Sequence, residues 1–133
     1  MFNAAFTQST VTVFINGVKK GEYIKKTGET DSVITLKKND CKKIQQLSVQ
    51  IKGEHIGNII YKRALEVTDS ADQFLLKTSE TAGTPGQFIF INTTLKSILV
   101  KGRSLKLYLL MEPANDMMMI PTKRIYMCKV AAK

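Results

Sequence analysis

The sequence predicts a single all-β domain, an antiparallel β-sandwich of about eight short strands with one or two short helical turns. Apolar and polar residues alternate over most of the chain, which is typical of strands that bury one face. Turn signals separate these runs at close spacing, and long helical patterns do not alternate with them. A sandwich of immunoglobulin-like or jelly-roll-like type fits this pattern, and a small closed barrel is the alternative. The 133 residues fit one domain, 1–133.

The most apolar stretch, residues 103–129, is expected to form a hairpin at the centre of a sheet. Its first half places Leu105, Leu107, Leu109 and Met111 on one face, because successive side chains of a strand point to opposite sides. Residues 112–116 supply a turn, since proline fixes φ and Asn and Asp tolerate tight backbone geometry. A second strand is expected over residues 124–130.

The earlier strands follow in order from the same alternation. Strand 10–15 ends at Asn16-Gly17, a pair typical of a type I′ hairpin because both positions need positive φ. The returning strand carries Gly21, which indicates a bulge or a break. The full set of further strands expected before the central hairpin is 18–25, 32–36, 47–52, 58–67, 73–77 and 87–91.

Two segments have helical rather than strand character. A helical turn is expected within 37–46, with Asn39 or Asp40 as N-cap. A second short helix is expected around 95–99, capped by residue 92 or 93 and closed near Gly102, where it would carry the chain from one sheet to the other. Residues 1–9 are interpreted as a loosely held leader, and residues 78–86 as a mobile loop.

A formal net charge of +9 is the unusual feature of the composition. Basic domains bind polyanions because cations beside phosphates release counterions. Lysine dominates, and the forked arginine side chain that favours specific recognition is present only at three positions. The candidate polyanion-binding residues are Lys19, Lys20, Lys25, Lys26, Lys37, Lys38, Lys42, Lys43, Arg63, Arg103 and Arg124.

The sequence offers little for catalysis, and the protein is predicted not to be an enzyme, with no cofactor and no metal site. Cys41 and Cys128 are far apart and neither forms a CxxC pair. Cys128 is expected in the core. The lysines flanking Cys41 would lower the pKa of its thiol, but a passive cysteine is preferred to a redox sensor there. A small enzyme using His55, the single histidine, is the weakest of three functional hypotheses.

The leading functional hypothesis is a non-catalytic binding or assembly module that acts through protein–protein contacts or self-association. It rests on Met117, Met118, Met119 and Ile120, an apolar run that cannot all face one core and is typical of adaptable contact surfaces. Binding of nucleic acid or another polyanion is the competing hypothesis. Because no signal peptide or membrane-spanning run is recognised, the protein is expected in the cytoplasm.

Overall fold

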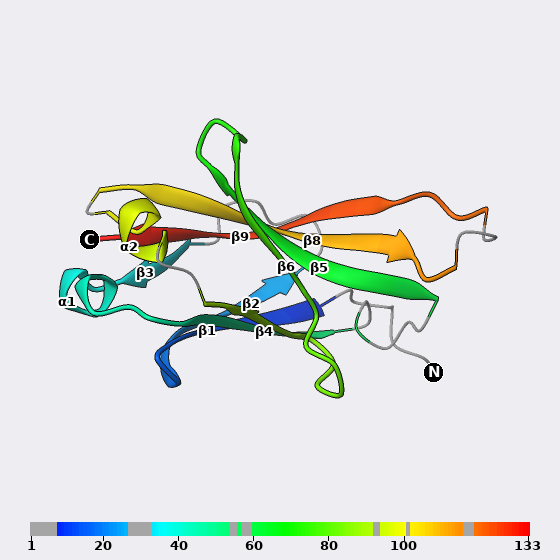
Figure 1. Cartoon of the computed structure of the whole chain (residues 1–133), viewed down its shortest axis with the longest axis horizontal. Coiled ribbons are helices and arrows are strands. Elements are labelled where there is room, and N and C mark those ends of the chain that lie inside the picture. Colours follow the sequence, from blue (N-terminus) through cyan, green and yellow to red (C-terminus); the bar gives the residue numbers. More distant parts are fainter. Residues whose placement is uncertain are drawn as a thin grey trace.

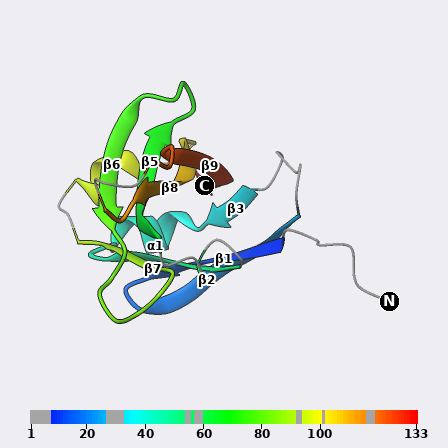
Figure 2. The same cartoon turned by 90° about the vertical axis from the view of Figure 1, so that its right-hand side faces the viewer.

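Nine strands form two facing sheets in the computed structural model, which describes residues 8–26, 33–53, 56, 60–91, 94–100, 102–115 and 119–133 (Figure 1). Seen from the end, the sheets make two layers with the core between them (Figure 2). The predicted β-sandwich is therefore confirmed. The strands of the described residues form two separate sheets rather than the alternative closed barrel.

The first sheet has four antiparallel strands in the order β2-β1-β4-β7. Their bounds are β1 Gln8–Ile15, β2 Val18–Lys26, β4 Leu47–Gly53 and β7 Gln87–Phe90. Asn16 and Gly17 join β1 to β2 with positive φ, as the hairpin signal predicts. The register between β1 and β2 shifts beside Gly21, so the expected bulge is also present.

The second sheet has five strands in the order β3-β9-β8-β5-β6. Their bounds are β3 Val33–Leu36, β9 Lys123–Ala132, β8 Ser104–Pro113, β5 Tyr61–Asp69 and β6 Phe74–Ser79. The β8–β9 hairpin lies centrally, as expected. One pair departs from the antiparallel prediction, because β3 runs parallel to β9.

Apolar and polar residues alternate along the strands, so that the apolar side chains of each strand point into the core. Leu105, Leu107, Leu109 and Met111 of β8 all point inward and are buried. Val11, Val13 and Ile15 of β1 face them from the other sheet, together with Phe88 of β7. Cys128 is fully buried in β9, which confirms its expected place in the core. Burial of this apolar surface is the main term that favours folding.

Two short helices lie at the same end of the sandwich as the end of β9 (Figure 1). They are α1, Lys38–Lys42, and α2, Leu95–Ile98. The N-caps are Lys37 and Thr94, so the predicted caps Asn39 and Asp40 are wrong: both lie inside α1. Residues 92 and 93 fall outside the described part. As predicted, α2 carries the chain between the sheets, from β7 to β8.

Residues 78–86, where a mobile loop is expected, contain the end of β6 and a hydrogen-bonded connection between the sheets. β6 continues to Ser79, and Glu80 forms an isolated bridge with Phe88 of the other sheet. Gly86 has a φ of +82°, and a Cβ on it would collide with the carbonyl oxygen of Ile51. Only glycine allows this close approach of two backbones. The turn-like composition of residues 78–86 does not indicate these contacts, because the residues that they contact lie outside the segment.

Candidate functional site

The end of the sandwich that carries α1 and α2 gathers cations from three distant parts of the chain. Lys37, Lys38, Lys42 and Lys43 come from α1 and its flanks. Lys96 lies on α2, while Arg103 and Lys133 lie beside the end of β9. We call these seven residues the basic end. Six of them are exposed, and Arg103 is half-buried.

The β1–β2 turn fixes the position of α1. The Asn16 side-chain oxygen accepts hydrogen bonds from the backbone N–H groups of Gln45 and Gln46 at 2.8 and 3.0 Å. Its amide nitrogen donates to the Lys43 carbonyl at 3.0 Å. A salt bridge of 3.1 Å between Lys20 of β2 and Asp40 holds the helix from another side. These bonds hold α1 in place, and with it the lysines of α1 and its flanks.

Core packing positions α2 in a similar way. Leu95, Ile98 and the following Leu99 are buried, which leaves Lys96 on the solvent side. The loop after α2 is joined to β9, because the Gly102 N–H donates to the Ala132 carbonyl at 2.7 Å. The Ala132 N–H in turn donates to the Arg103 carbonyl at 3.0 Å. These bonds bring Arg103 next to the end of β9.

Within the described residues, none of the seven cations of the basic end forms a salt bridge with a carboxylate. Six of the seven described acidic residues pair with cations that lie outside the basic end. The seventh, Asp69, accepts hydrogen bonds from the backbone N–H groups of Ala71 and Gln73 in its own turn. The six pairs are Lys19–Glu22, Lys20–Asp40, Arg63–Glu80, Lys77–Glu112, Lys106–Asp72 and Arg124–Glu66. Among the described residues, the positive charge of this end is therefore not balanced by ion pairs, which is also true of the separate strand lysines Lys52, Lys62, Lys123 and Lys129.

The predicted polyanion-binding residues therefore separate into groups. The basic end contains five of them, which are Lys37, Lys38, Lys42, Lys43 and Arg103. In contrast, Lys19, Lys20, Arg63 and Arg124 are occupied in ion pairs. The side chains of Lys25 and Lys26 lie outside the described part of the chain. Tyr23, which lies among these lysines, packs against the core.

Arg63 and Glu80 form a largely buried pair where the two sheets meet. The Arg63 Nε–Glu80 Oε2 distance is 2.8 Å, and the side chains are only 8% and 19% exposed. The same carboxylate oxygen accepts a hydrogen bond from the Gly86 N–H at 2.7 Å. Glu80 thereby ties β5 to the connection that enters β7. This arrangement makes the pair a structural link between the sheets.

A second polar cluster lies on the outer face of the five-stranded sheet. The Tyr108 hydroxyl donates to Asp72 at 2.6 Å, and Lys106 reaches the same oxygen at 3.2 Å. These two hydrogen bonds lower the pKa of Asp72, while burial and the bond to Asp72 raise the pKa of Tyr108. The Arg124 guanidinium lies 3.6 Å from the Tyr108 ring centroid. Both shifts move the pKa values away from neutrality, which does not favour acid–base catalysis.

The pKa of the Cys41 thiol is shifted in the direction opposite to the one that its flanking lysines suggest. Its side chain is 4% exposed, and burial followed by the charge of Asp40 raises the pKa of the thiol. The prediction that neighbouring lysines lower this pKa is wrong. The lysine side chains extend into solvent, where their fields are screened, whereas the sulfur sits in an apolar setting. Cys41 thus stays a neutral thiol near pH 7.

The other candidate residues are only partly covered by the described chain. Met119 is 99% exposed, while Ile120 packs against the core. Met117, Met118 and His55 lie outside the described residues. Among the described residues, no three His, Cys, Asp or Glu side chains gather as metal ligands, and no helix is long and apolar enough to span a membrane.

Lys96 and Lys133 are the members of the basic end that sequence reasoning missed. Lys96 lies between the apolar residues Leu95 and Ile98 of a short helix, and nothing in the local pattern indicates that α2 faces α1. Lys133 reaches this end because β9 runs parallel to β3, where the Lys133 N–H donates to the Leu36 carbonyl at 3.0 Å. Both placements depend on contacts between distant segments.

Comparison with known proteins adds no family to these observations. No protein-family model matches the chain, and no curated protein matches its sequence.

Proposed function

We propose that this protein is a non-catalytic module that binds nucleic acid by its phosphate backbone through the basic end. The observation that carries the proposal is the concentration of seven cations on α1, α2 and the end of β9 with no carboxylate pairing to them in the described residues. Phosphates would displace only counterions and water there, since no ion pair among the described residues has to break.

The side-chain types support contact that is independent of base sequence. Six of the seven cations are lysines, which act as mobile point charges rather than as planar forks for base edges. The described part of the basic end carries no aromatic side chain, so stacking on bases is not expected to contribute. Binding should therefore depend on charge and salt, and little on sequence.

The alternative of assembly through Met117 to Ile120 receives less support from the geometry. Of the two members in the described part, Ile120 is already used in packing and Met119 alone is fully exposed. Single exposed apolar side chains are normal on protein surfaces. We therefore place polyanion binding first.

Fluorescence anisotropy of a labelled single-stranded oligonucleotide tests the proposal. With seven phosphate contacts, a slope of about 0.7 per contact predicts that affinity falls roughly 10³-fold between about 50 and 200 mM salt. Two oligonucleotides of different sequence but equal length should bind with similar affinity. Absence of binding at the lower salt, or binding that is insensitive to salt, would contradict the proposal.

A further inference from the structure

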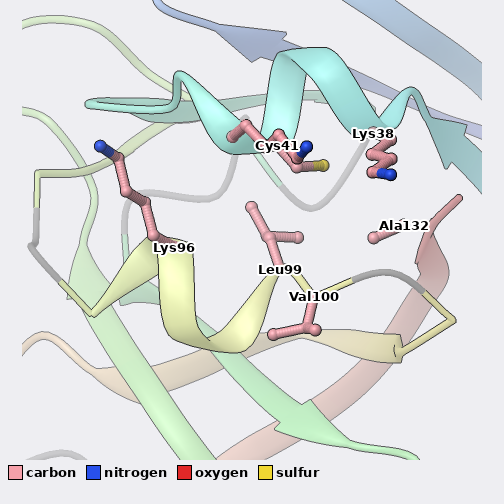
Figure 3. Close-up of a pocket in the computed structure, with 7 residues that line it drawn as sticks. Lys38, Cys41, Lys96, Leu99, Val100 and Ala132 are labelled. Carbon is pink, nitrogen blue, oxygen red and sulfur yellow. The ribbon is translucent and has the colours of Figure 1, made fainter.

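A cavity of about 320 Å³ lies between α1 and α2 at the centre of the basic end. Its lining combines Lys38, Cys41 and Lys42 of α1 with Lys96, Leu99 and Val100 of the α2 region, and Ala132 closes it from β9. Figure 3 shows Cys41 and Leu99 pointing toward the space between the two helices. Three segments that are distant in sequence thus build one recess.

The floor of the cavity is apolar. Cys41, Leu99 and Ala132 are each at most 4% exposed, and Val100 is half exposed at the edge. The raised pKa of the Cys41 thiol keeps this wall uncharged near neutral pH. An apolar recess of this kind favours the hydrocarbon part of a ligand over water, because water finds few hydrogen-bond partners there.

The rim has the opposite character. Lys38 and Lys42 are one turn apart on α1, so both lie on the face that lines the cavity. Lys96 stands on α2, on the other side of Cys41 from Lys38 (Figure 3). Within the described residues none of these three ammonium groups pairs with a carboxylate. A ligand that fits both parts has a hydrocarbon body and an anionic head.

A second hollow in the described part of the chain lacks this combination of an apolar floor and unpaired cations. A hollow of about 390 Å³ lies between β6 and β7, with Leu76, Ile89 and Phe90 in its lining. Its one cation, Lys77, already pairs with Glu112 at 3.5 Å. That hollow has no unbalanced charge to select an anion.

We infer that the cavity between α1 and α2 is a binding site for a small aliphatic carboxylate. At about 30 Å³ per water-sized group, the cavity holds on the order of ten non-hydrogen atoms. An eight-carbon chain fills this space and leaves its carboxylate among Lys38, Lys42 and Lys96. The inference does not depend on nucleic-acid binding, although the shared lysines would make the two ligands compete.

Titration of the ¹⁵N-labelled protein with octanoate, followed by amide chemical shifts, tests the inference. The shifts should concentrate at Cys41, Leu99, Val100 and Ala132, with a dissociation constant on the order of 10⁻⁴ M for a ligand of this size. Butyrate, which lacks most of the chain, and 1-octanol, which lacks the charge, should each bind at least tenfold more weakly.

Matched variants separate the rim from general charge effects. K38E and K96E should each weaken octanoate binding about tenfold, while K62E, on an exposed lysine of β5 outside the lining, should leave it unchanged. Shifts located elsewhere, or equal binding of octanoate and 1-octanol, would overturn the inference. Octanoate binding without oligonucleotide binding would overturn the proposed function alone, and the reverse result would overturn only the cavity site.

Discussion

Replacing Lys38, Lys42 and Lys96 together with glutamate should weaken oligonucleotide binding at least a hundredfold at about 50 mM salt. Each lost contact removes roughly 1 kcal/mol of attraction, taking unit charges about 4 Å apart in water. The loss of three contacts already corresponds to a more than hundredfold loss of affinity, and the new carboxylates add repulsion of the phosphates. All three lysines are exposed, so the fold should be retained. Anisotropy titration measures the effect.

The control for this variant changes the same amount of charge elsewhere. Lys52, Lys62 and Lys123 are exposed on sheet strands and lie outside the basic end. Their replacement with glutamate also lowers the formal net charge from +9 by six, to +3. If binding depends on the basic end, this control should lose much less affinity. Equal losses in the two variants would mean that overall charge, and not the arrangement at α1 and α2, drives binding.

Glu80→Ala should destabilise the protein by about 3 kcal/mol or more, because it leaves the buried Arg63 guanidinium without its carboxylate. The Gly86 N–H loses its acceptor as well. For a chain of this size the loss corresponds to a fall of roughly 10 °C in Tm. Denaturant unfolding monitored by circular dichroism measures the change in the free energy of unfolding.

Glu112→Ala is the matched control for the buried pair. Glu112 also pairs with a cation of the same sheet, Lys77, but both side chains are almost half exposed. Exposed pairs contribute less than about 1 kcal/mol, since water screens them. A Glu80→Ala variant no less stable than Glu112→Ala would show that Glu80 does not link the two sheets.

Local pattern was sufficient to predict most of the strands. The β8–β9 hairpin and the Asn16-Gly17 turn were readable because alternation and turn chemistry act over a few residues. The boundaries were less certain: β5 begins at Tyr61 and runs on to Asp69, through residues 68–69 that read as a turn. Hydrogen bonds to the neighbouring strand β8 extend it there.

The candidate site depended on information that local pattern does not contain. Four of the seven residues of the basic end were visible as lysine doublets, but Lys96 and Lys133 join them only through tertiary contacts. Arg63 appeared to be a free surface cation, because its partner Glu80 lies 17 positions away, just after the end of β6. The fold decides which cations pair with carboxylates and which of the remaining cations lie close together. The second of these locates the basic end.

The salt dependence of binding in an alanine variant tests whether the basic end contacts the phosphates. Replacing Lys38, Lys42 and Lys96 with alanine removes three of the seven proposed phosphate contacts without adding repulsion. The slope of log Kd against log salt should therefore fall from about 5 in the wild type to about 3. An unchanged slope would show that the phosphates bind elsewhere on the protein and would contradict the assignment of the basic end.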